Sequence, residues 1–333
     1  MRHVRWGREL GAAAVVLVGL CGMVCISVAA ERTPVVATFS IVGYDPATGD
    51  LGVAVQSKFF AVGAVVPFAK AGVGAIATQA SANTTYGPRG LEMLAAGQTP
   101  EAVLAALLAD DAHADQRQVG IVDADGRAVA HTGARCLEWA GHASGPNFTA
   151  QGNILVSQET VDAMARTFRD TAGSLGERLM RALEAGQAAG GDSRGRQSAA
   201  LLVVRAGGGY AGFDDRYCDL RVDDHPTPIR ELRRLFDMWQ GWALVIEGYK
   251  HADNADWDAA FAAGRKAIAL DPAKGEPYYH LACYYAKAGM YEEALQTLGL
   301  AVQRQADLAA RAKTDTDFEA LWSEDGFVAI VGR

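Results

Sequence analysis

Cysteine is scarce in the sequence, so disulfides cannot be the main support of the fold. The 333 residues contain five cysteines, and only Cys136, Cys218 and Cys283 follow residue 30. Three cysteines are too few for a disulfide scaffold, and the core must therefore form by burial of apolar side chains. An oxidising compartment would permit a Cys136–Cys218 disulfide, which the sequence leaves open.

Clusters of basic residues are also lacking. The chain has 31 Lys and Arg residues against 39 Asp and Glu residues, and its formal net charge is −8. Nucleic-acid binding depends on basic side chains that gather on one surface, often among aromatic residues. We therefore expect no nucleic-acid partner.

Motifs for metals, phosphates and dinucleotides are missing too. His113, His131 and His142 do not have the spacing of zinc ligands. The sequence has no glycine-rich phosphate loop, and no dinucleotide fingerprint or Gly-x-Ser-x-Gly elbow stands between an expected strand and an expected helix. One acidic run alternates along an expected hairpin and matches no tight ligand motif; it consists of Asp214, Asp215, Asp219, Asp223, Asp224 and His225. The sequence predicts no metal and no cofactor.

The start of the chain has the pattern of a signal peptide. Residues 1–8 carry three arginines, residues 11–30 are apolar and uncharged, and small residues close the run at 27–30. We expect cleavage after residue 29 or 30, export, and a periplasmic or extracellular location in a bacterium. A permanent membrane anchor is the alternative, because the run is nearly long enough to span a bilayer. No later apolar run is that long, so no stable membrane span is expected after cleavage.

The end of the chain is a helical repeat. Residues 241–308 repeat with a period of 34, since Trp257 and Tyr291 are 34 residues apart, as are Ala260 and Ala294. This resembles the tetratricopeptide repeat, a helix, a tight turn and a second helix. The resemblance implies either a peptide-binding groove or a packing and dimerisation module. We expect a protein partner at the repeats, and a homo-oligomer is left open.

Between the two ends, strand-like and helical segments alternate, which predicts an α+β domain. Two sheets stacked between helix layers would bury this pattern, with the first strand in a central place. The expected division is a signal peptide at 1–30, an α+β domain at 31–232 and a helical domain at 233–333. Strands are expected at 35–44, 51–57, 63–68, 73–78, 118–122, 128–132, 198–204 and 217–222, with a pair of helices after the fourth and after the sixth.

Thr38 stands at the head of the first expected strand. A threonine at a newly made N-terminus carries its own base, because an α-amino group has a pKa near ~7.7–8.0. That amine can take the hydroxyl proton at neutral pH, and no histidine is needed. The alternative is that Thr38 is an ordinary β-branched strand residue.

Several stretches of this domain resemble one family. They are residues 38–42, 53–59, 73–80, 151–155, 190–198 and 212–217. Taken in this order, the segment from Thr38 to about Arg234 resembles the domain of unknown function 1028 family, a group placed among the Ntn (N-terminal-nucleophile) hydrolases. The resemblance implies an Ntn-hydrolase-like αββα four-layer sandwich, followed here by the all-α tetratricopeptide-like domain.

By analogy with the Ntn superfamily, Thr38 would be the nucleophile of an amide hydrolase. The chain departs from the family, whose members often have Met directly before this threonine. Cleavage of the signal peptide leaves up to eight residues in front of Thr38. A second cut between Ala37 and Thr38, or signal cleavage at that bond, would be needed to free the amine.

Three residues are candidates to assist Thr38 in catalysis. Ser57 could hydrogen-bond the amine, Lys58 could place a cation near the nucleophile, and Asn153 could donate its amide to a developing oxyanion. Each has a structural alternative: a simple strand hydroxyl for Ser57, a solvated strand end for Lys58 and a left-handed turn for Asn153.

Four further residues are candidates for substrate binding. Gln79 could act as a second amide donor. Asp192, Arg194 and Arg196 lie in a glycine-rich loop and could hold a substrate carboxylate, because the arginine fork suits bidentate contact. The alternative for these three is a solvated loop.

These expectations favour an exported N-terminal-nucleophile amidohydrolase that acts on a small amide or short peptide. The rival hypothesis is a non-catalytic binding or scaffold protein that keeps the Ntn fold and uses its helical tail for protein contacts.

Overall fold

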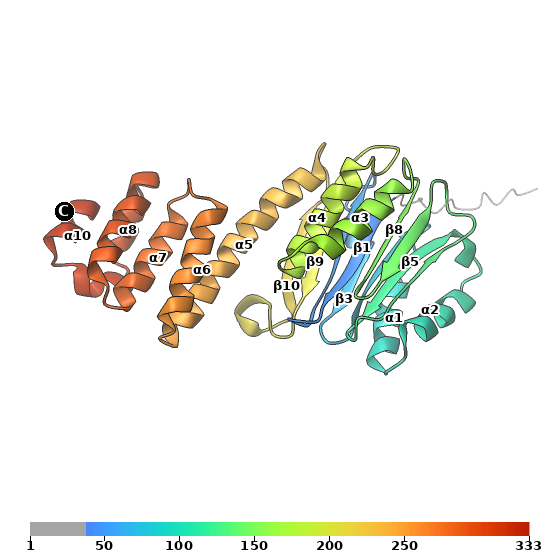
Figure 1. The fold of residues 1–333 in the computed structure, drawn as a ribbon, viewed down its shortest axis with the longest axis horizontal. Coiled ribbons are helices and arrows are strands. Elements are labelled where there is room, and N and C mark those ends of the chain that lie inside the picture. Colours follow the sequence, from blue (N-terminus) through green and yellow to red (C-terminus); the bar gives the residue numbers. More distant parts are fainter. Residues whose placement is uncertain (1–37, 333) are drawn as a thin grey trace, which may run out of the picture. The chain divides into compact units, whose positions relative to one another are not determined.

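The computed structural model of the protein describes residues 38–332 (Figure 1). The expected signal peptide at 1–30 lies outside the described residues. Within the described part of the chain, no helix combines the length and the apolar character needed to cross a membrane.

A six-stranded antiparallel sheet contains the first strand. Its order is β10-β9-β2-β1-β8-β7, so β1 lies between β2 and β8, and the expectation of a central first strand is confirmed. The first six residues of β1 are buried, and all eight residues of β2 are. The strands are β1 (Thr38–Asp45), β2 (Asp50–Ser57), β7 (Gly141–Gly145), β8 (Phe148–Asn153), β9 (Ser198–Val204) and β10 (Arg216–Val222).

A second, four-stranded antiparallel sheet has the order β3-β4-β5-β6. β4 is buried along its whole length, and β6 at the edge is half-buried. The strands are β3 (Pro67–Lys70), β4 (Gly74–Ala80), β5 (Arg117–Asp123) and β6 (Ala128–Thr132).

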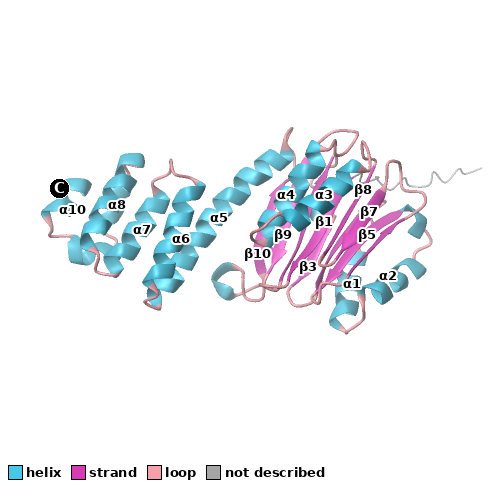
Figure 2. Cartoon of the chain, in the orientation of Figure 1, coloured by secondary structure: helices cyan, strands magenta, loops and turns pink. Residues whose placement is uncertain are grey.

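Each sheet has a pair of helices packed against it (Figure 2). The six-stranded sheet contacts α3 (Glu159–Asp170) and α4 (Leu175–Ala188) through a cluster that includes Phe39 of β1 and Phe168 of α3. The four-stranded sheet contacts α1 (Tyr86–Ala95) and α2 (Pro100–Ala109) through Ile76 and its neighbours.

A third apolar cluster lies between the two sheets. It joins alternate residues of β1 and β2, such as Val42 and Val53, to Ala75 and Val122 of the other sheet. Because side chains alternate across a strand, Phe39 and Ile41 face the helices while Thr38, Ser40 and Val42 face the opposite sheet. The side of β1 that carries Thr38 is therefore the inner side.

Thr99 caps the start of α2. The Thr99 side chain accepts a hydrogen bond from the Ala102 main-chain N–H, and Pro100 occupies the first turn. Proline fits there because its missing N–H would have no partner inside the helix.

Two strands were not expected from the sequence, and one expected strand is divided. β7 and β8 form a hairpin that adds to the free side of β1. The segment expected as a strand at 63–68 instead begins as a 3-10 turn (Val62–Ala64), and β3 starts only at Pro67. The missed hairpin matters most, because β8 is the direct neighbour of the strand that carries Thr38.

The C-terminal region is entirely helical in the described residues. Its first helix, α5 (Pro228–Asp253), is one continuous helix that crosses residue 232, where the domain boundary was expected. Near its start, Ile229 and Phe236 belong to the cluster of the six-stranded sheet, and nearer its end Ala252 packs with the following helices. The others are α6 (Trp257–Leu270), α7 (Glu276–Lys287), α8 (Tyr291–Arg304), α9 (Leu308–Ala312), η4 (Thr316–Leu321) and α10 (Asp325–Val331).

The helical region has the features expected of the repeat. Ala260 and Ala294, which are 34 residues apart, are both fully buried where helices pack closely. Gly289 turns the chain between α7 and α8 with φ +75, a left-handed conformation that glycine adopts without strain.

Candidate functional site

The candidate site lies where several strands begin or end. In the six-stranded sheet, Thr38 at the start of β1 pairs with Ser57 at the end of β2 and with Asn153 at the end of β8. Ser57 in turn pairs with Ser198 at the start of β9. Paired residues of antiparallel strands direct their side chains to the same face. Four polar side chains therefore form a row across one end of the inner face.

Thr38 is fully buried in this row. Its hydroxyl donates a hydrogen bond to Ser57 Oγ at 3.1 Å. Its carbonyl oxygen accepts a bond of 3.4 Å from Gln79 Nε2, which comes from β4 of the opposite sheet. The structure thus brings Thr38, Ser57, Asn153 and Gln79 together, as the sequence interpretation requires.

Gln118 on β5 is the centre of the site, and sequence analysis missed it. Its Nε2 donates to the carbonyl oxygens of Gly152 at 2.7 Å and Gly141 at 3.1 Å. Its Oε1 accepts from Gln79 Nε2 at 2.8 Å and from Asn153 Nδ2 at 3.0 Å. One glutamine therefore ties the amides of both sheets to the β7–β8 hairpin.

A second polar layer lies one step further inside. Ser40 donates to Gln79 Oε1 at 2.6 Å and accepts from Gln151 Nε2 at 2.6 Å. Gly120 permits this layer, because a Cβ atom there would stand 2.3 Å from Gln151 Oε1. All three polar side chains are fully buried, so buried hydrogen bonds rather than apolar contacts join the sheets here.

The glycine-rich loop is held together by Asp192, whose side chain has no exposed surface. Asp192 accepts from the Lys58 main-chain N–H at 3.0 Å and forms an ion pair with Arg194 at 3.0 Å. Lys58 Nζ donates to the carbonyl oxygen of Arg196 at 3.4 Å. These four predicted site residues therefore form one group that anchors the loop to the end of β2.

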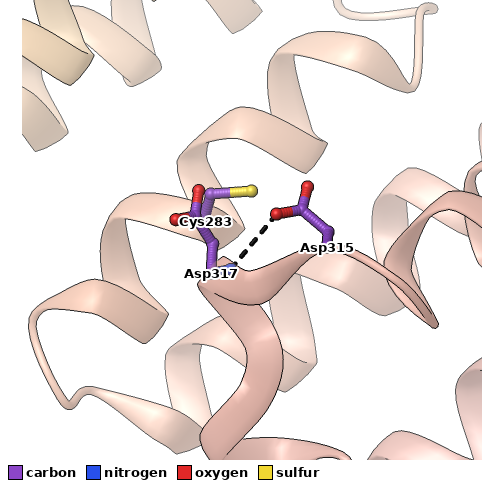
Figure 3. Close-up of side chains that lie close together, drawn as sticks. All are labelled: Cys283, Asp315 and Asp317. Carbon is purple, nitrogen blue, oxygen red and sulfur yellow. Dashed lines mark hydrogen bonds between the residues drawn. The ribbon is translucent and has the colours of Figure 1, made fainter.

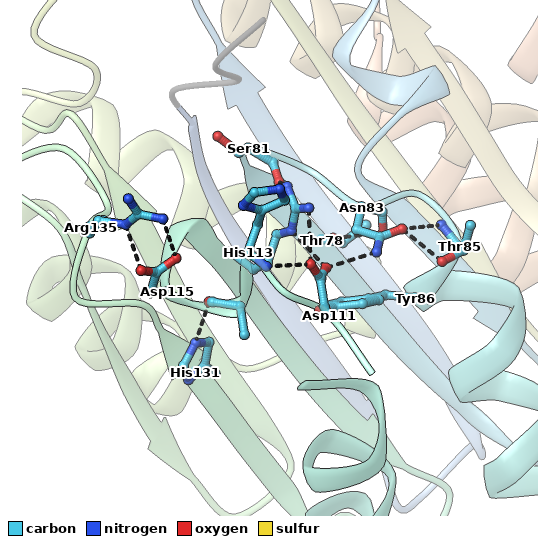
Figure 4. A network of polar contacts seen from close by, with 12 residues as sticks. Thr78, Ser81, Asn83, Thr85, Tyr86, Asp111, His113, Asp115, His131 and Arg135 are labelled. Atoms are coloured by element: carbon cyan, nitrogen blue, oxygen red, sulfur yellow. Dashed lines mark hydrogen bonds and ion pairs between the residues drawn. The ribbon is translucent and has the colours of Figure 1, made fainter. Parts of the chain in front are cut away.

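A charged network supports the neighbouring end of the four-stranded sheet (Figure 4). Asp111, which follows α2, accepts from Tyr86 Oη at 2.8 Å, Asn83 Nδ2 at 2.9 Å and Arg117 Nε at 2.8 Å. Arg117 also donates to the carbonyl oxygen of Ser81. Because Ser81 follows β4 and Arg117 begins β5, the network fixes the two strand ends that carry Gln79 and Gln118.

The electrostatics of this network favour the charged carboxylate. Burial alone would raise the pKa of Asp111, but the hydrogen bonds from Arg117 and Asn83 outweigh it and hold that pKa well below its usual range. Burial, together with the bond to Asp111, raises the pKa of Tyr86. Sequence patterns gave no sign of this network, since its members come from separate segments of the chain.

The three cysteines of the described residues are free thiols, so the structure does not contain the Cys136–Cys218 disulfide that the sequence left open. Cys136 lies near the site, and its thiol donates to the carbonyl oxygen of Arg117 at 3.4 Å.

The helical region contains a second group of titratable side chains (Figure 3). The sulfur atom of Cys283 and one carboxylate oxygen each of Asp315 and Asp317 lie within 4.8 Å of one another. Tyr279 donates to Asp315 at 2.7 Å and Tyr249 donates to Asp317 at 3.4 Å. Burial raises the pKa of Asp317 and of Cys283. The hydrogen bonds join η4 to helices α5 and α7, which is a structural role.

A cavity of about 510 Å³ opens in the same region between α5, α6 and the start of α7. Its lining includes Met238, Trp242 and Leu270, all of which are exposed to solvent. His280 also lines it; burial lowers the pKa of His280 to about 4, so its ring is neutral at physiological pH.

Both the two-sheet domain and the helical region contain a segment that matches a known protein family. Residues 38–232 match the family of unknown function DUF1028, and residues 263–296 match a tetratricopeptide repeat. The crystal structure of protein SPO2555 from Silicibacter pomeroyi, described with the same family, is similar to this chain. It is 30% identical, with a TM-score of 0.56, over 61% of this chain and 88% of that one. No curated protein matches the sequence. The chain belongs to the DUF1028 family of unknown function and carries a tetratricopeptide repeat after the family domain.

Proposed function

We propose that the protein is an exported N-terminal-nucleophile amidohydrolase, with Thr38 as nucleophile and a small amide or short peptide as substrate. One observation carries the proposal: Thr38 begins the central strand, and its hydroxyl bonds to Ser57 within a buried group of amide and hydroxyl side chains. If Thr38 is the first residue of the mature chain, its free α-amine lies next to its own hydroxyl, and the base and the nucleophile belong to one residue.

The layering of the domain supports the same proposal. Apolar clusters join α3 and α4 to one sheet, the two sheets to each other, and α1 and α2 to the second sheet. We assign this order to the αββα four-layer sandwich of the Ntn hydrolases.

The proposed reaction requires a free α-amine on Thr38. Thr38 Oγ1 would attack the carbonyl carbon of the substrate while the amine accepts the hydroxyl proton. The amine would then pass that proton to the leaving nitrogen as the C–N bond breaks, which leaves an acyl ester on Thr38. Water would hydrolyse this ester and regenerate the hydroxyl. The bond between Ala37 and Thr38 must therefore be cut in the active protein.

The other site residues receive roles from their contacts. Ser57 orients the Thr38 hydroxyl through their bond of 3.1 Å. Gln79 holds the Thr38 carbonyl and thereby the start of β1. Asp192 accepts a hydrogen bond from the main-chain N–H of Lys58, and this bond holds the glycine-rich loop next to the end of β2. A catalytic role for the Lys58 cation stays a prediction, as does substrate contact by the binding candidates Gln79, Asp192, Arg194 and Arg196.

An acylating probe tests the nucleophile without knowledge of the substrate. The protein is purified from a bacterium that exports it and is incubated with a β-lactone, whose carbonyl is attacked by activated hydroxyl groups. We expect one adduct on the peptide that begins at Thr38, no adduct with Thr38→Ala, and a retained adduct with Thr38→Ser. Thr48→Ala, a change in an exposed turn, is the matched control. Equal labelling of the wild type and Thr38→Ala would contradict the proposal.

A second candidate function is protein binding by the helical region without catalysis. The tetratricopeptide repeat at 263–296 and the cavity with the exposed Trp242 favour it. This alternative predicts that the mature chain begins before Thr38, and that Thr38→Ala changes no activity.

A further inference from the structure

The side-chain oxygen of Asn153 is a buried acceptor without a donor. Asn153 is fully buried, and its Oδ1 has no hydrogen-bond partner in the structure. Buried polar atoms are nearly always bonded, so an orphan acceptor in the middle of a polar network calls for a specific explanation. In the described residues, few other buried side-chain atoms share this state; they belong to Gln56, Gln187 and His280.

Main-chain carbonyls determine which end of the Asn153 amide is unpaired. Gln118 directs its nitrogen at the carbonyl oxygens of Gly152 and Gly141, which only accept hydrogen bonds. Its oxygen must then face Asn153, and Asn153 must present its nitrogen to that oxygen, at 3.0 Å. The orphan atom is therefore an oxygen, which can accept a bond but cannot donate one to an oxyanion. Only the second N–H of Asn153 Nδ2, the one not directed at Gln118, could serve the oxyanion role predicted for this residue.

The register pairs Asn153 with the residue that would carry the amine. Asn153 is the direct partner of Thr38 across β1 and β8, and both side chains face the opposite sheet. An uncut Thr38 has a single main-chain N–H. Cutting the bond before Thr38 turns this amide into an amine and creates N–H donors that the precursor does not have. An acceptor that is orphaned in the uncut chain, on the direct strand partner of Thr38, fits this change.

We propose that Asn153 Oδ1 accepts a hydrogen bond from the α-amine of Thr38 once the chain is cut, which makes Asn153 a positioning residue for the base. The inference rests on the proposed function, because it needs a mature chain that begins at Thr38. The bond directs one N–H of the amine to Asn153. It therefore limits the directions in which the lone pair of the amine nitrogen can point. It also stabilises the protonated amine relative to the neutral form.

The test measures the pKa of the Thr38 α-amine in the mature protein, from the pH dependence of its trace acetylation followed by mass spectrometry. We expect Asn153→Leu, which has a similar shape and no acceptor, to lower this pKa by about one unit. Asn153→Asp, which keeps an oxygen and adds a negative charge, should raise it. Gln151→Met is the matched control, because it removes a buried amide of the same strand that bonds to Ser40 instead, and it should leave the pKa unchanged.

The outcomes separate the two proposals. If the wild type begins at Thr38 and both Asn153 variants keep its amine pKa, the assignment of Asn153 is wrong and the proposed function stands. If the wild type does not begin at Thr38, both proposals are wrong. Should the variants fail to fold, a crystal structure of the mature wild type decides: a distance of at most ~3.2 Å between Thr38 N and Asn153 Oδ1 supports the bond, and a distance beyond ~4 Å overturns it.

Discussion

Replacing Asp111 by asparagine should destabilise the domain far more than the same change one residue earlier. The Asp111 carboxylate is only 8% exposed and accepts hydrogen bonds from Tyr86, Asn83 and Arg117, whose own side chain is 12% exposed. Removing one charge of such a buried pair typically costs ~3–5 kcal/mol. Asparagine keeps one acceptor oxygen, so we expect a loss of about 2–4 kcal/mol for Asp111→Asn.

The neighbouring Asp110 provides the matched control. It forms an ion pair of 2.8 Å with Arg89, but its side chain is 65% exposed and that of Arg89 is 40% exposed. Solvent screening reduces such pairs to about 0–1 kcal/mol, and we expect Asp110→Asn to cost less than ~0.5 kcal/mol.

Urea unfolding followed by circular dichroism compares the two variants. With a slope of about 2 kcal/mol per molar urea, Asp111→Asn should lower the midpoint by about 1–2 M. The Asp110→Asn midpoint should stay within about 0.3 M of the wild type. Equal midpoints for the two variants would refute the view that the Asp111 network holds the ends of β4 and β5.

Three further predictions follow from the same contacts. The pKa of Asp111 in the folded protein lies below its unfolded value of about 3.9, so the charged carboxylate stabilises the fold fully above about pH 4 and progressively less as the pH falls. Urea unfolding should therefore show a smaller difference in the free energy of unfolding between the wild type and Asp111→Asn at pH 3 than at pH 7. Gly120→Ala would place a Cβ atom 2.3 Å from the buried Gln151 Oε1, and it should lower the free energy of unfolding, measured by thermal unfolding, by about 1–3 kcal/mol. A Cβ atom at Gly241 in α5 would have no atom within 4 Å, so Gly241→Ala should raise the free energy of unfolding by up to ~1 kcal/mol. A Gly241→Ala variant less stable than Gly120→Ala would contradict the packing around these two glycines. A thiol reagent at pH 8 should modify the partly exposed Cys136 before the buried Cys283, whose pKa burial raises, and peptide mapping reports the order.

Much of the fold could be predicted because its apolar strands carry clear signals. β9 was expected at 198–204 and is found there, and β1 and β2 were placed on either side of the turn at 45–50. β7 and β8 were missed because their sequences, Gly-His-Ala-Ser-Gly and Phe-Thr-Ala-Gln-Gly-Asn, are rich in glycine and polar residues and do not resemble strands. β8 is nevertheless fully buried, because its polar side chains bond across the two sheets.

Strand ends marked two residues of the candidate site in the sequence. Thr38 and Ser57 stand out because each bounds an apolar strand. Gln118 could not be identified as the centre of the site, because a glutamine in a strand gives no local signal. Its role depends on carbonyls of Gly141 and Gly152, which folding brings next to it from distant parts of the chain.

The N-terminal residue of the mature protein tests the central claim most directly. Intact mass and N-terminal sequencing are applied to the chain purified from an exporting bacterium. Our account predicts a chain that begins at Thr38, with the α-amine free next to Ser57 and Asn153. A chain that begins at residue 30 or 31 would show that Thr38 has no free amine, and would contradict the proposal that Thr38 is an N-terminal nucleophile.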